Sequence, residues 1–317
     1  EETSMPTTEA WKNAVVRHWS ANVIMAPMVR GSELAFRMLG RKYGCSSAYG
    51  PMLRAASVLQ GNEAHNMSTC PEDRPLVVQL CGNKPHEVAK AAEQIFAELN
   101  GEVDGIDFNL GCPQVVADQG NFGAFLASRN PEVALECIRA LAAAVTTMEV
   151  SSPRSALSTS ITPSSTTSTY STTMIGRKRR LNADDDHQVG DPGDMASASI
   201  SYSSARRPQV SAKIRLLPTI EQTIEFARML ETAGCDLICV HCRTPNSKHN
   251  GAPDYEAGRL IVNSVNIPVV INGGIDSEEK ARRVLQETGA HAVMVAQGFL
   301  RNHRMLVDVS SSPAELA

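Results

Sequence analysis

The sequence predicts an α/β fold of the (β/α)8 class, known as a TIM barrel. The first observation is that eight short apolar runs, most of them closed by Gly or Pro, alternate with segments whose apolar residues recur at helical spacing. The second is composition: aromatic residues make up 4% of the chain and hydrophobic residues 42%, which indicates an aliphatic core. Such a core is typical of parallel strands that helices cover on their outer face.

The first half of the barrel is predicted over residues 1–148. A short amphipathic helix is expected over residues 9–19, before the first strand. Strands are expected over residues 22–28, 45–52, 75–82 and 106–110, the last within the stretch 105–114. Helices are expected over residues 33–43, from the second strand to about 65, over 85–99 and over 131–147, with Ser32 as the N-cap of the first of these. Residues 120–126 are expected to form a loop.

The composition changes abruptly over residues 149–208. Ser and Thr dominate this segment, with a basic run at residues 177–180 and an acidic run at 184–186. A segment of this kind buries too little apolar surface to offset the entropy of ordering it, so a disordered insertion is predicted. The basic run is either a solvated charge cluster or a nuclear-import or phosphate-binding segment.

The second half of the barrel is predicted over residues 209–317. Strands are expected over residues 210–216, 237–244, 268–274 and 292–298. Helices are expected from the Thr219 cap to residue 233, over 255–265 and over 277–288. Because the carboxyl ends of the strands form one face of such a barrel, side chains at those ends are candidates for a common site.

The eight cysteines lie within or beside predicted strands and helices, which is typical of free thiols in a reducing compartment. A cytoplasmic protein is therefore predicted, with nuclear import an option through the basic run, and a monomer is expected. The segment Cys239-Val-His-Cys242 has the look of a metal motif, but its thiols are expected on opposite faces of a strand, so no metal site is predicted. No apolar run approaches the ~20 residues of a membrane span, so no membrane partner is expected. The net charge is −4, so a nucleic acid would need a local basic patch.

One stretch, Gly105-Ile-Asp-Phe-Asn-Leu-Gly-Cys-Pro-Gln114, alternates apolar and polar residues and then breaks at Gly111 and Pro113. It reads as a strand that brings the Cys112 thiol to a loop at the barrel mouth. A single cysteine is more often a small buried hydrophobe than a reactive group, so the thiol alone is a weak signal. The residues at the ends of the other strands strengthen the interpretation of Cys112 as a site residue.

The strand ends together describe a site for flavin mononucleotide (FMN). Gln79 and Asn109 carry amides suited to the edge of a heterocycle, and Lys213 offers a positive charge to a group that becomes anionic. Glycines after strands seven and eight, in Asn272-Gly-Gly274 and at Gly298, let backbone N–H groups approach a phosphate. Each residue also has a structural interpretation: Gln79 capping a strand, Lys213 paired with a carboxylate, His241 in the core, or the glycines serving a turn.

The sequence resembles the tRNA-dihydrouridine synthase family over residues 22 to about 302, apart from the insertion. The motifs that carry the resemblance are APMV with SELAFR, PLVVQLCGN, DFNLGCPQ with GAFL, AKIR, VHCRT and INGGI. The residues of these motifs are most similar to those of the eukaryotic cytoplasmic branch of the family, which acts on D-loop uridines 16 and 17. The resemblance implies reduction of the uracil C5=C6 bond in tRNA, with FMN as cofactor and NADPH or NADH as reductant.

The resemblance also implies residue roles. Cys112 would donate a proton to C5 as the general acid, while hydride from reduced FMN goes to C6. The implied FMN-binding residues are Pro27, Met28, Val29, Gln79, Lys213, His241, Asn272, Gly273, Gly274, Ala296 and Gln297. Asn109, Arg215 and Arg243 would contact the uracil or the RNA. The target base would have to leave its stack to reach the barrel mouth.

The chain departs from the family pattern in three places. Ala296-Gln297-Gly298 lacks a charged side chain that relatives carry, the loop at residues 118–122 lacks basic residues, and the insertion at residues 149–208 is foreign to the pattern. The family adds a helical tRNA-binding domain after the barrel, and this domain is expected to be missing here. Two alternatives stay open: a small-molecule flavin reductase of the dihydroorotate dehydrogenase type, and an FMN- or RNA-binding barrel without turnover.

Overall fold

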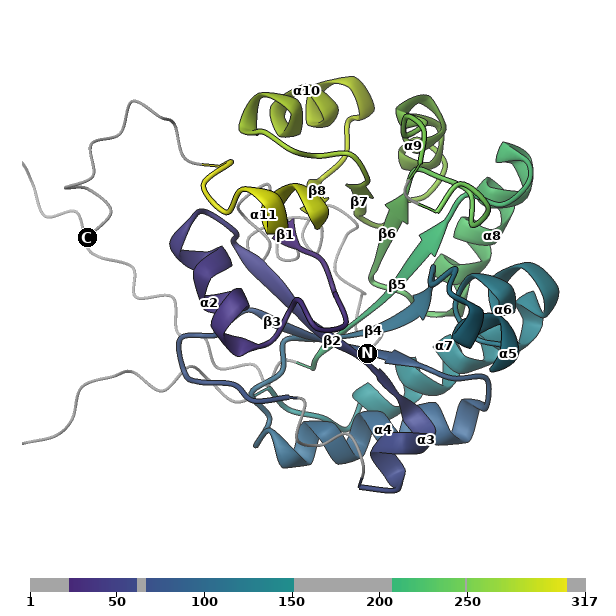
Figure 1. Ribbon diagram of the computed structural model, residues 1–317. Coiled ribbons are helices and arrows are strands. Elements are labelled where there is room, and N and C mark those ends of the chain that lie inside the picture. The colour runs from purple at the N-terminus through teal and green to yellow at the C-terminus, as the bar shows by residue number, and fades with distance from the viewer. Residues whose placement is uncertain (1–22, 62–66, 151–206, 249, 307–317) are drawn as a thin grey trace, which may run out of the picture. The chain divides into compact units, whose positions relative to one another are not determined.

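The structure, a computed structural model, describes residues 23–61, 67–150, 207–248 and 250–306. Within these residues the chain forms a closed barrel of parallel strands in the order β1 to β8, and β8 pairs with β1. The strands are β1 (Val23–Met25), β2 (Ser47–Arg54), β3 (Leu76–Cys81), β4 (Gly105–Leu110), β5 (Gln209–Arg215), β6 (Leu237–His241), β7 (Val269–Asn272) and β8 (Ala292–Val295). The predicted TIM barrel is confirmed (Figure 1).

Helices follow the strands and lie outside the ring that the strands form (Figure 1). They are α2 (Leu34–Lys42), α3 (Ala55–Leu59), α4 (Pro85–Glu98), α5 (Val115–Gln119), α6 (Ala124–Arg129), α7 (Pro131–Val145), α8 (Ile220–Ala233), α9 (Tyr255–Val262), α10 (Glu278–Thr288) and α11 (Gln297–Arg301). The predicted helix over residues 9–19 and residues 151–206 of the predicted disordered insertion lie outside the described residues. The half-barrel boundaries at residues 148 and 209 stay a prediction.

Thr219 caps α8 as predicted, whereas the N-cap predicted at Ser32 is wrong. The Thr219 hydroxyl accepts the backbone N–H of Gln222, whose side chain accepts the N–H of Thr219 in return. Ser32 instead turns back to Met28: its Oγ accepts the Met28 N–H at 2.9 Å and donates to the Met28 carbonyl at 3.0 Å. Glu33 is the N-cap of α2 and makes no side-chain capping bond.

Three short helices, α5, α6 and α11, lie where the sequence predicted no helix. α6 begins within the loop predicted over residues 120–126, and α5 lies directly before that loop. The eighth strand ends at Val295 instead of residue 298, because the chain turns into α11 at Gln297. All three helices follow the carboxyl ends of strands, so they shape the face where the site was predicted.

Alternation along the strands divides the core into an inner and an outer layer. The larger cluster packs the outer face of the sheet against the helices, as in Val78, Ile106 and Val240. The smaller cluster fills the barrel interior and consists of Ile24, Ala26, Tyr49, Val77, Leu237, Cys239, Val270, Ala292 and Met294. Since side chains two residues further along the same strands also face inward, Gln79, His241 and Asn272 lie above this apolar filling.

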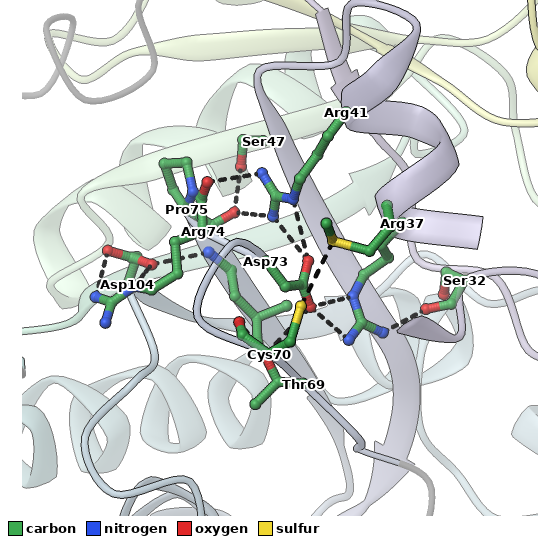
Figure 2. A network of polar contacts seen from close by, with 12 residues as sticks. Ser32, Arg37, Arg41, Ser47, Thr69, Cys70, Asp73, Arg74, Pro75 and Asp104 are labelled. Carbon is green, nitrogen blue, oxygen red and sulfur yellow. Dashed lines mark hydrogen bonds and ion pairs between the residues drawn. The ribbon is translucent and has the colours of Figure 1, made fainter. Parts of the chain in front are cut away.

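A buried ion network braces the loop between β1 and α2 (Figure 2). Asp73 accepts from Arg37, with Nη2 and Oδ2 2.6 Å apart, and from Arg41, with Nη2 and Oδ1 3.0 Å apart. Arg37 and Asp73 are fully buried, and Arg37 also donates to the Ser32 carbonyl at 2.7 Å. Through Ser32 and its bonds to Met28, the network fixes the course of residues 27–32 at the barrel mouth.

Asp73→Ala is expected to destabilise the protein by about 3–5 kcal/mol, because it leaves the buried Arg37 guanidinium without its counter-ion. The free energy of unfolding from urea denaturation measures this. Glu256→Gln, which removes one partner of an exposed ion pair with Arg259, is the control and should leave that free energy unchanged. Equal effects of the two substitutions would contradict the bracing role of Asp73.

Candidate functional site

A cavity of about 810 Å³ opens at the carboxyl ends of the strands. Every site residue that the sequence predicted lines it: Pro27, Met28, Val29, Gln79, Asn109, Cys112, Lys213, Arg215, His241, Arg243, Asn272, Gly273, Gly274, Ala296 and Gln297. The structure therefore brings the predicted set together, while the role of each member stays a prediction. The cavity is also lined by Arg30, Lys280 and Arg301, which the sequence reasoning missed because they lie beyond the strand ends.

Cys112 lies half-buried just after β4, and its loop is held by the Asn109 side chain. The Asn109 Oδ1 accepts the backbone N–H groups of Gly111 at 3.1 Å and of Cys112 at 2.9 Å. Gly123, with φ 62°, packs on the other side, where a Cβ would come within 2.9 Å of the Cys112 Cβ. The position of the thiol is thus fixed from β4 and from the start of α6.

Burial raises the pKa of the Cys112 thiol above its ordinary value of 9.0. A backbone hydrogen bond from Gln114 and the positive charges of Arg215 and Lys213 oppose this effect but do not cancel it. The thiol consequently holds its proton at neutral pH. A group in this state can donate a proton, and it is a poor nucleophile or metal ligand until it loses that proton.

Asn109 and Gln79 form a row of buried amides on a carboxylate that the sequence reasoning missed. Asn109 Nδ2 donates to Gln79 Oε1 at 2.8 Å, and Gln79 Nε2 donates to Asp107 Oδ2 at 2.7 Å. Ser211 donates to the other oxygen of Asp107 at 2.6 Å. The signal was present in the sequence, because Asp107 is a charged residue between apolar neighbours in a strand predicted to be buried.

Lys213 lies beside Asn109 in the register of β4 and β5. Its side chain lines the cavity, and it has no hydrogen bond or ion pair to any residue that the structure describes. Burial lowers the pKa of the ammonium group, with a contribution from Arg215, while the nearby Cys239 and Asp107 oppose the shift. An unpaired, partly desolvated cation of this kind is suited to an anionic or electron-rich ligand group.

Arg215 and Arg243 hold loops at the cavity wall. Arg215 donates to the carbonyl oxygens of Gly111 at 2.9 Å and of Lys248 at 2.7 Å, so it joins the Cys112 loop to the loop after β6. Burial is the main reason why the pKa of Arg215 is lowered to about 10. Arg243 donates to the Gly251 carbonyl and lies 3.2 Å from His241 Nε2. The contact with uracil or RNA predicted for both arginines stays a prediction.

The loop after β7 is shaped for a close approach of the backbone. Gly273 has φ 117°, and a Cβ at this position would come within 2.9 Å of His241 Cδ2. The Tyr255 hydroxyl donates to the Gly273 carbonyl at 2.7 Å, and Asn272 Nδ2 donates to the Met294 carbonyl at 2.8 Å. The strand ends of β7 and β8 are therefore tied together beneath a glycine turn that opens to the cavity.

Cys239 and Cys242 lie on opposite sides of the sheet, as the sequence predicted. Cys239 belongs to the inner cluster, with its Sγ 3.5 Å from Met294 Sδ, and Cys242 belongs to the outer cluster. Across residues 23–61, 67–150, 207–248 and 250–306, no group of three or more His, Cys, Asp or Glu could hold a metal ion. None of the helices in these residues is long and apolar enough to cross a membrane.

Fold and site define a (β/α)8 barrel protein whose ligand site lies at the carboxyl ends of its strands, the position of the active site in barrel enzymes. The chain matches the model of the family described as Dihydrouridine synthase (Dus) over residues 24–155 and 203–314. It belongs to this family.

Two relatives show how far the similarity extends. The chain is 31% identical to the "tRNA-dihydrouridine(16/17) synthase [NAD(P)(+)]-like" protein of Rattus norvegicus over 98% of this chain and 56% of the rat protein. It is also 31% identical to the "tRNA-dihydrouridine(20a/20b) synthase [NAD(P)+]-like" protein of Mus musculus, over 98% of this chain and 78% of the mouse protein. The chain thus spans about half the length of the 16/17 relative.

Among solved structures, the chain is similar to dihydroorotate dehydrogenase of Eimeria tenella in complex with ferulenol, with a TM-score of 0.51. The sequence identity is 12%, and the match covers 94% of this chain and 88% of that chain. This likeness shows the barrel fold.

Alkylation of Cys112 by iodoacetamide is expected to follow a pH profile whose midpoint lies above 9.0, since only the thiolate reacts and burial raises the pKa of this thiol. Mass spectrometry of peptides from the full chain, alkylated between about pH 7 and about pH 10, measures the rate at this position. The Cys112→Ser variant identifies the peptide signal. A midpoint below 9.0 would contradict the protonated state inferred above.

Proposed function

We propose that this chain is the catalytic barrel of an FMN-dependent tRNA-dihydrouridine synthase, which reduces the C5=C6 bond of a D-loop uridine. The observation that carries the proposal is the meeting of a protonated thiol, Cys112, and an unpaired cation, Lys213, in one cavity of a chain that belongs to the Dus family. NADPH or NADH is proposed as the reductant, in line with the names of the relatives.

The residues of the cavity fit FMN. The volume of about 810 Å³ lies in the range of about 300–1,000 Å³ that is usual for pockets holding small molecules. Gly273 has a positive φ and packs directly against His241, and a glycine turn of this kind, at the end of β7, suits a phosphate held by backbone N–H groups. Lys213 would face the pyrimidine edge of the isoalloxazine ring, where its charge favours the reduced anion. The first-strand contacts would come from Pro27, Met28 and Val29, and those at β8 from Ala296 and Gln297.

The reaction adds one hydride and one proton across C5=C6. FMN, when bound, would supply the redox chemistry, namely transfer of a hydride equivalent from the nicotinamide to C6. Cys112 donates the proton from its Sγ to C5 as the general acid, and the raised pKa keeps that proton in place until transfer. Asn109 holds the backbone of Cys112 and is bonded to Gln79, and both amides are proposed to orient the pyrimidine and the flavin edge.

tRNA is proposed as the partner because the named relatives act on it. The target base would have to leave its stack to reach a cavity at the barrel mouth. Arg243, together with Arg30 and Arg301 at the rim, is proposed to contact phosphates. Uridine 16 or 17 is the proposed position. A cytoplasmic monomer remains our expectation from the sequence.

The purified full chain is expected to carry an absorption band near about 450 nm from oxidised flavin. Gly273→Ala should weaken FMN binding by about tenfold or more, because its Cβ would meet His241. Gly61→Ala is the matched control: Gly61 also has a positive φ, but a Cβ there meets nothing within 4 Å. Fluorescence titration with FMN measures both. A wild-type protein that binds no FMN contradicts the proposal and also the dihydroorotate dehydrogenase alternative.

Cys112→Ala is expected to keep FMN and lose about 10²–10⁴-fold in the rate of dihydrouridine formation, the usual contribution of a general acid. Mass-spectrometric mapping of dihydrouridine in tRNA incubated with FMN, NADPH and the full chain gives the rate and the modified position. Cys81→Ala, which removes a buried thiol of the same small cluster, is the control and should retain activity. Wild-type turnover by Cys112→Ala would remove the thiol from the mechanism. An FMN-loaded wild-type protein that leaves tRNA unchanged would instead favour the binding barrel without turnover.

A further inference from the structure

A chain of buried hydrogen bonds leads from Asp107 to the loop that carries Cys112. Asp107 accepts from Gln79, Gln79 accepts from Asn109, and Asn109 accepts the backbone N–H groups of Gly111 and Cys112, all at 2.7–3.1 Å. Asp107 is fully buried and lies below the cavity lining, to which the two amides belong. The hydrogen bonds that connect the carboxylate to the cavity lining therefore run through these amides.

The groups at the two ends of this row of hydrogen bonds determine which way the Asn109 and Gln79 amides are turned. The backbone N–H groups of Gly111 and Cys112 can only donate, so the Asn109 oxygen faces them and its Nδ2 faces Gln79. An ionised carboxylate can only accept, so the Gln79 Nε2 faces Asp107 and its Oε1 faces Asn109. If either amide were turned over, two donors or two acceptors would face each other in a buried place.

We propose that Asp107 is a positioning residue, which sets the orientation of the Gln79 and Asn109 amides and thereby holds the Cys112 thiol and the cavity-facing edges of both amides in place. Its importance for dihydrouridine formation rests on the function proposed above. The ionised Asp107 carboxylate can only accept hydrogen bonds, and this fixes the orientation of Gln79. A group at this position that could also donate would allow either orientation of the Gln79 amide.

The surroundings of Asp107 support an ionised carboxylate at neutral pH. Burial raises its pKa to about 6, while hydrogen bonds from Ser211 and Gln79 and the charge of Lys213 oppose this shift. Four charged or titratable groups act on Asp107 or are acted on by it. They are Tyr49 of β2, Lys213 of β5, Cys239 of β6 and Cys235 just before β6, whose pKa is also raised by burial. Burial raises the pKa of Tyr49 and Cys239, so both stay neutral, and Lys213 is the cation that favours the charged form of Asp107.

An exchange of acid and amide between positions 79 and 107 tests the proposal. Gln79→Glu alone places two carboxylates against each other. In the double variant Gln79→Glu/Asp107→Asn, the amide at 107 donates to the new carboxylate at 79 and accepts from Ser211, and the carboxylate at 79 accepts from Asn109. Asn109 then keeps its direction, and so does the Cys112 loop. Ser211→Ala is the control, because it removes a hydrogen bond to Asp107 without touching the two amides. It is compared with wild type at about pH 9, far above the carboxylate's pKa of about 6, where the carboxylate is ionised.

The readout is the alkylation rate of Cys112 in the full chain as purified. Gln79→Glu should change the rate by about fivefold or more, and the double variant and Ser211→Ala should lie within about twofold of wild type. If Gln79→Glu does not fold, a double variant that does fold counts as the same rescue and supports the proposal. A double variant as perturbed as Gln79→Glu, or as unfolded, overturns the proposal. So does a Ser211→Ala protein whose Cys112 is as perturbed as that of Gln79→Glu.

The pH dependence of stability gives a second readout. Two facing carboxylates can share a proton, so at least one pKa of the pair in the folded Gln79→Glu variant rises above its value in the unfolded chain. The variant's stability should then increase as the pH falls through this raised value and decrease as the pH rises. The difference in melting temperature between wild type and Gln79→Glu is expected to shrink from about pH 8 to about pH 5, and a constant difference overturns the facing arrangement.

Dihydrouridine formation, measured in parallel, separates this proposal from the function on which it rests. A wild-type chain that leaves tRNA unmodified, together with rescue of Cys112 alkylation in the double variant, refutes the function and keeps the positioning role. An active wild type without rescue refutes the positioning role and keeps the function.

Discussion

In a closed parallel barrel, the two-residue period of each strand decides which side chains face the interior, and the structure of this protein depends on that constraint. Positions that face inward near the start of the strands are apolar, such as Val77, Val270 and Ala292, and they fill the interior. On β3, β6 and β7, the inward side chains two residues further along are polar: Gln79, His241 and Asn272. The bottom of the cavity therefore lies at the level where the inward side chains of these strands change from apolar to polar.

A polar layer inside a barrel is stable only if its groups are paired, since each unpaired buried group costs about 1–3 kcal/mol. Here the buried side-chain atoms of the described residues all have partners. Asp107, Gln79 and Asn109 satisfy one another in a row, and the row ends on the backbone of the Cys112 loop. The hydrogen bonds that satisfy these buried polar groups therefore also position the Cys112 loop beside the cavity. The same bonds contribute to stability and to the geometry of the site. Lys213 differs from these residues because it is only partly buried, and its side chain lines the cavity without a hydrogen bond or ion pair to a described residue.

The strands and the set of cavity-lining residues could be predicted from the sequence because both follow from periodicity. Apolar runs closed by Gly or Pro located all eight strands within a few residues, and the strand ends then gathered on one face by topology alone. Contacts between distant segments were not readable in this way. Ser32 has the sequence context of an N-cap, but its hydroxyl bonds to Met28, and the loop carbonyls held by Arg215 lie far from it in the sequence. The role of Asp107 likewise needs partners on two neighbouring strands, and the register that joins them is a property of the folded sheet.

Three arginines donate hydrogen bonds to backbone carbonyl oxygens of the loops that form the cavity wall. Arg37 braces the loop after β1 through Ser32, Arg215 joins the loops after β4 and β6, and Arg243 binds the loop after β6 through Gly251. Arginine suits this task because its planar fork of donors can hold several carbonyls at once and keeps its charge when buried. The loops of the mouth are consequently fixed by the barrel before any ligand enters. A preformed site of this kind loses little ordering entropy on binding, which suits a reaction that requires a thiol, a ring and a cation in fixed relative positions.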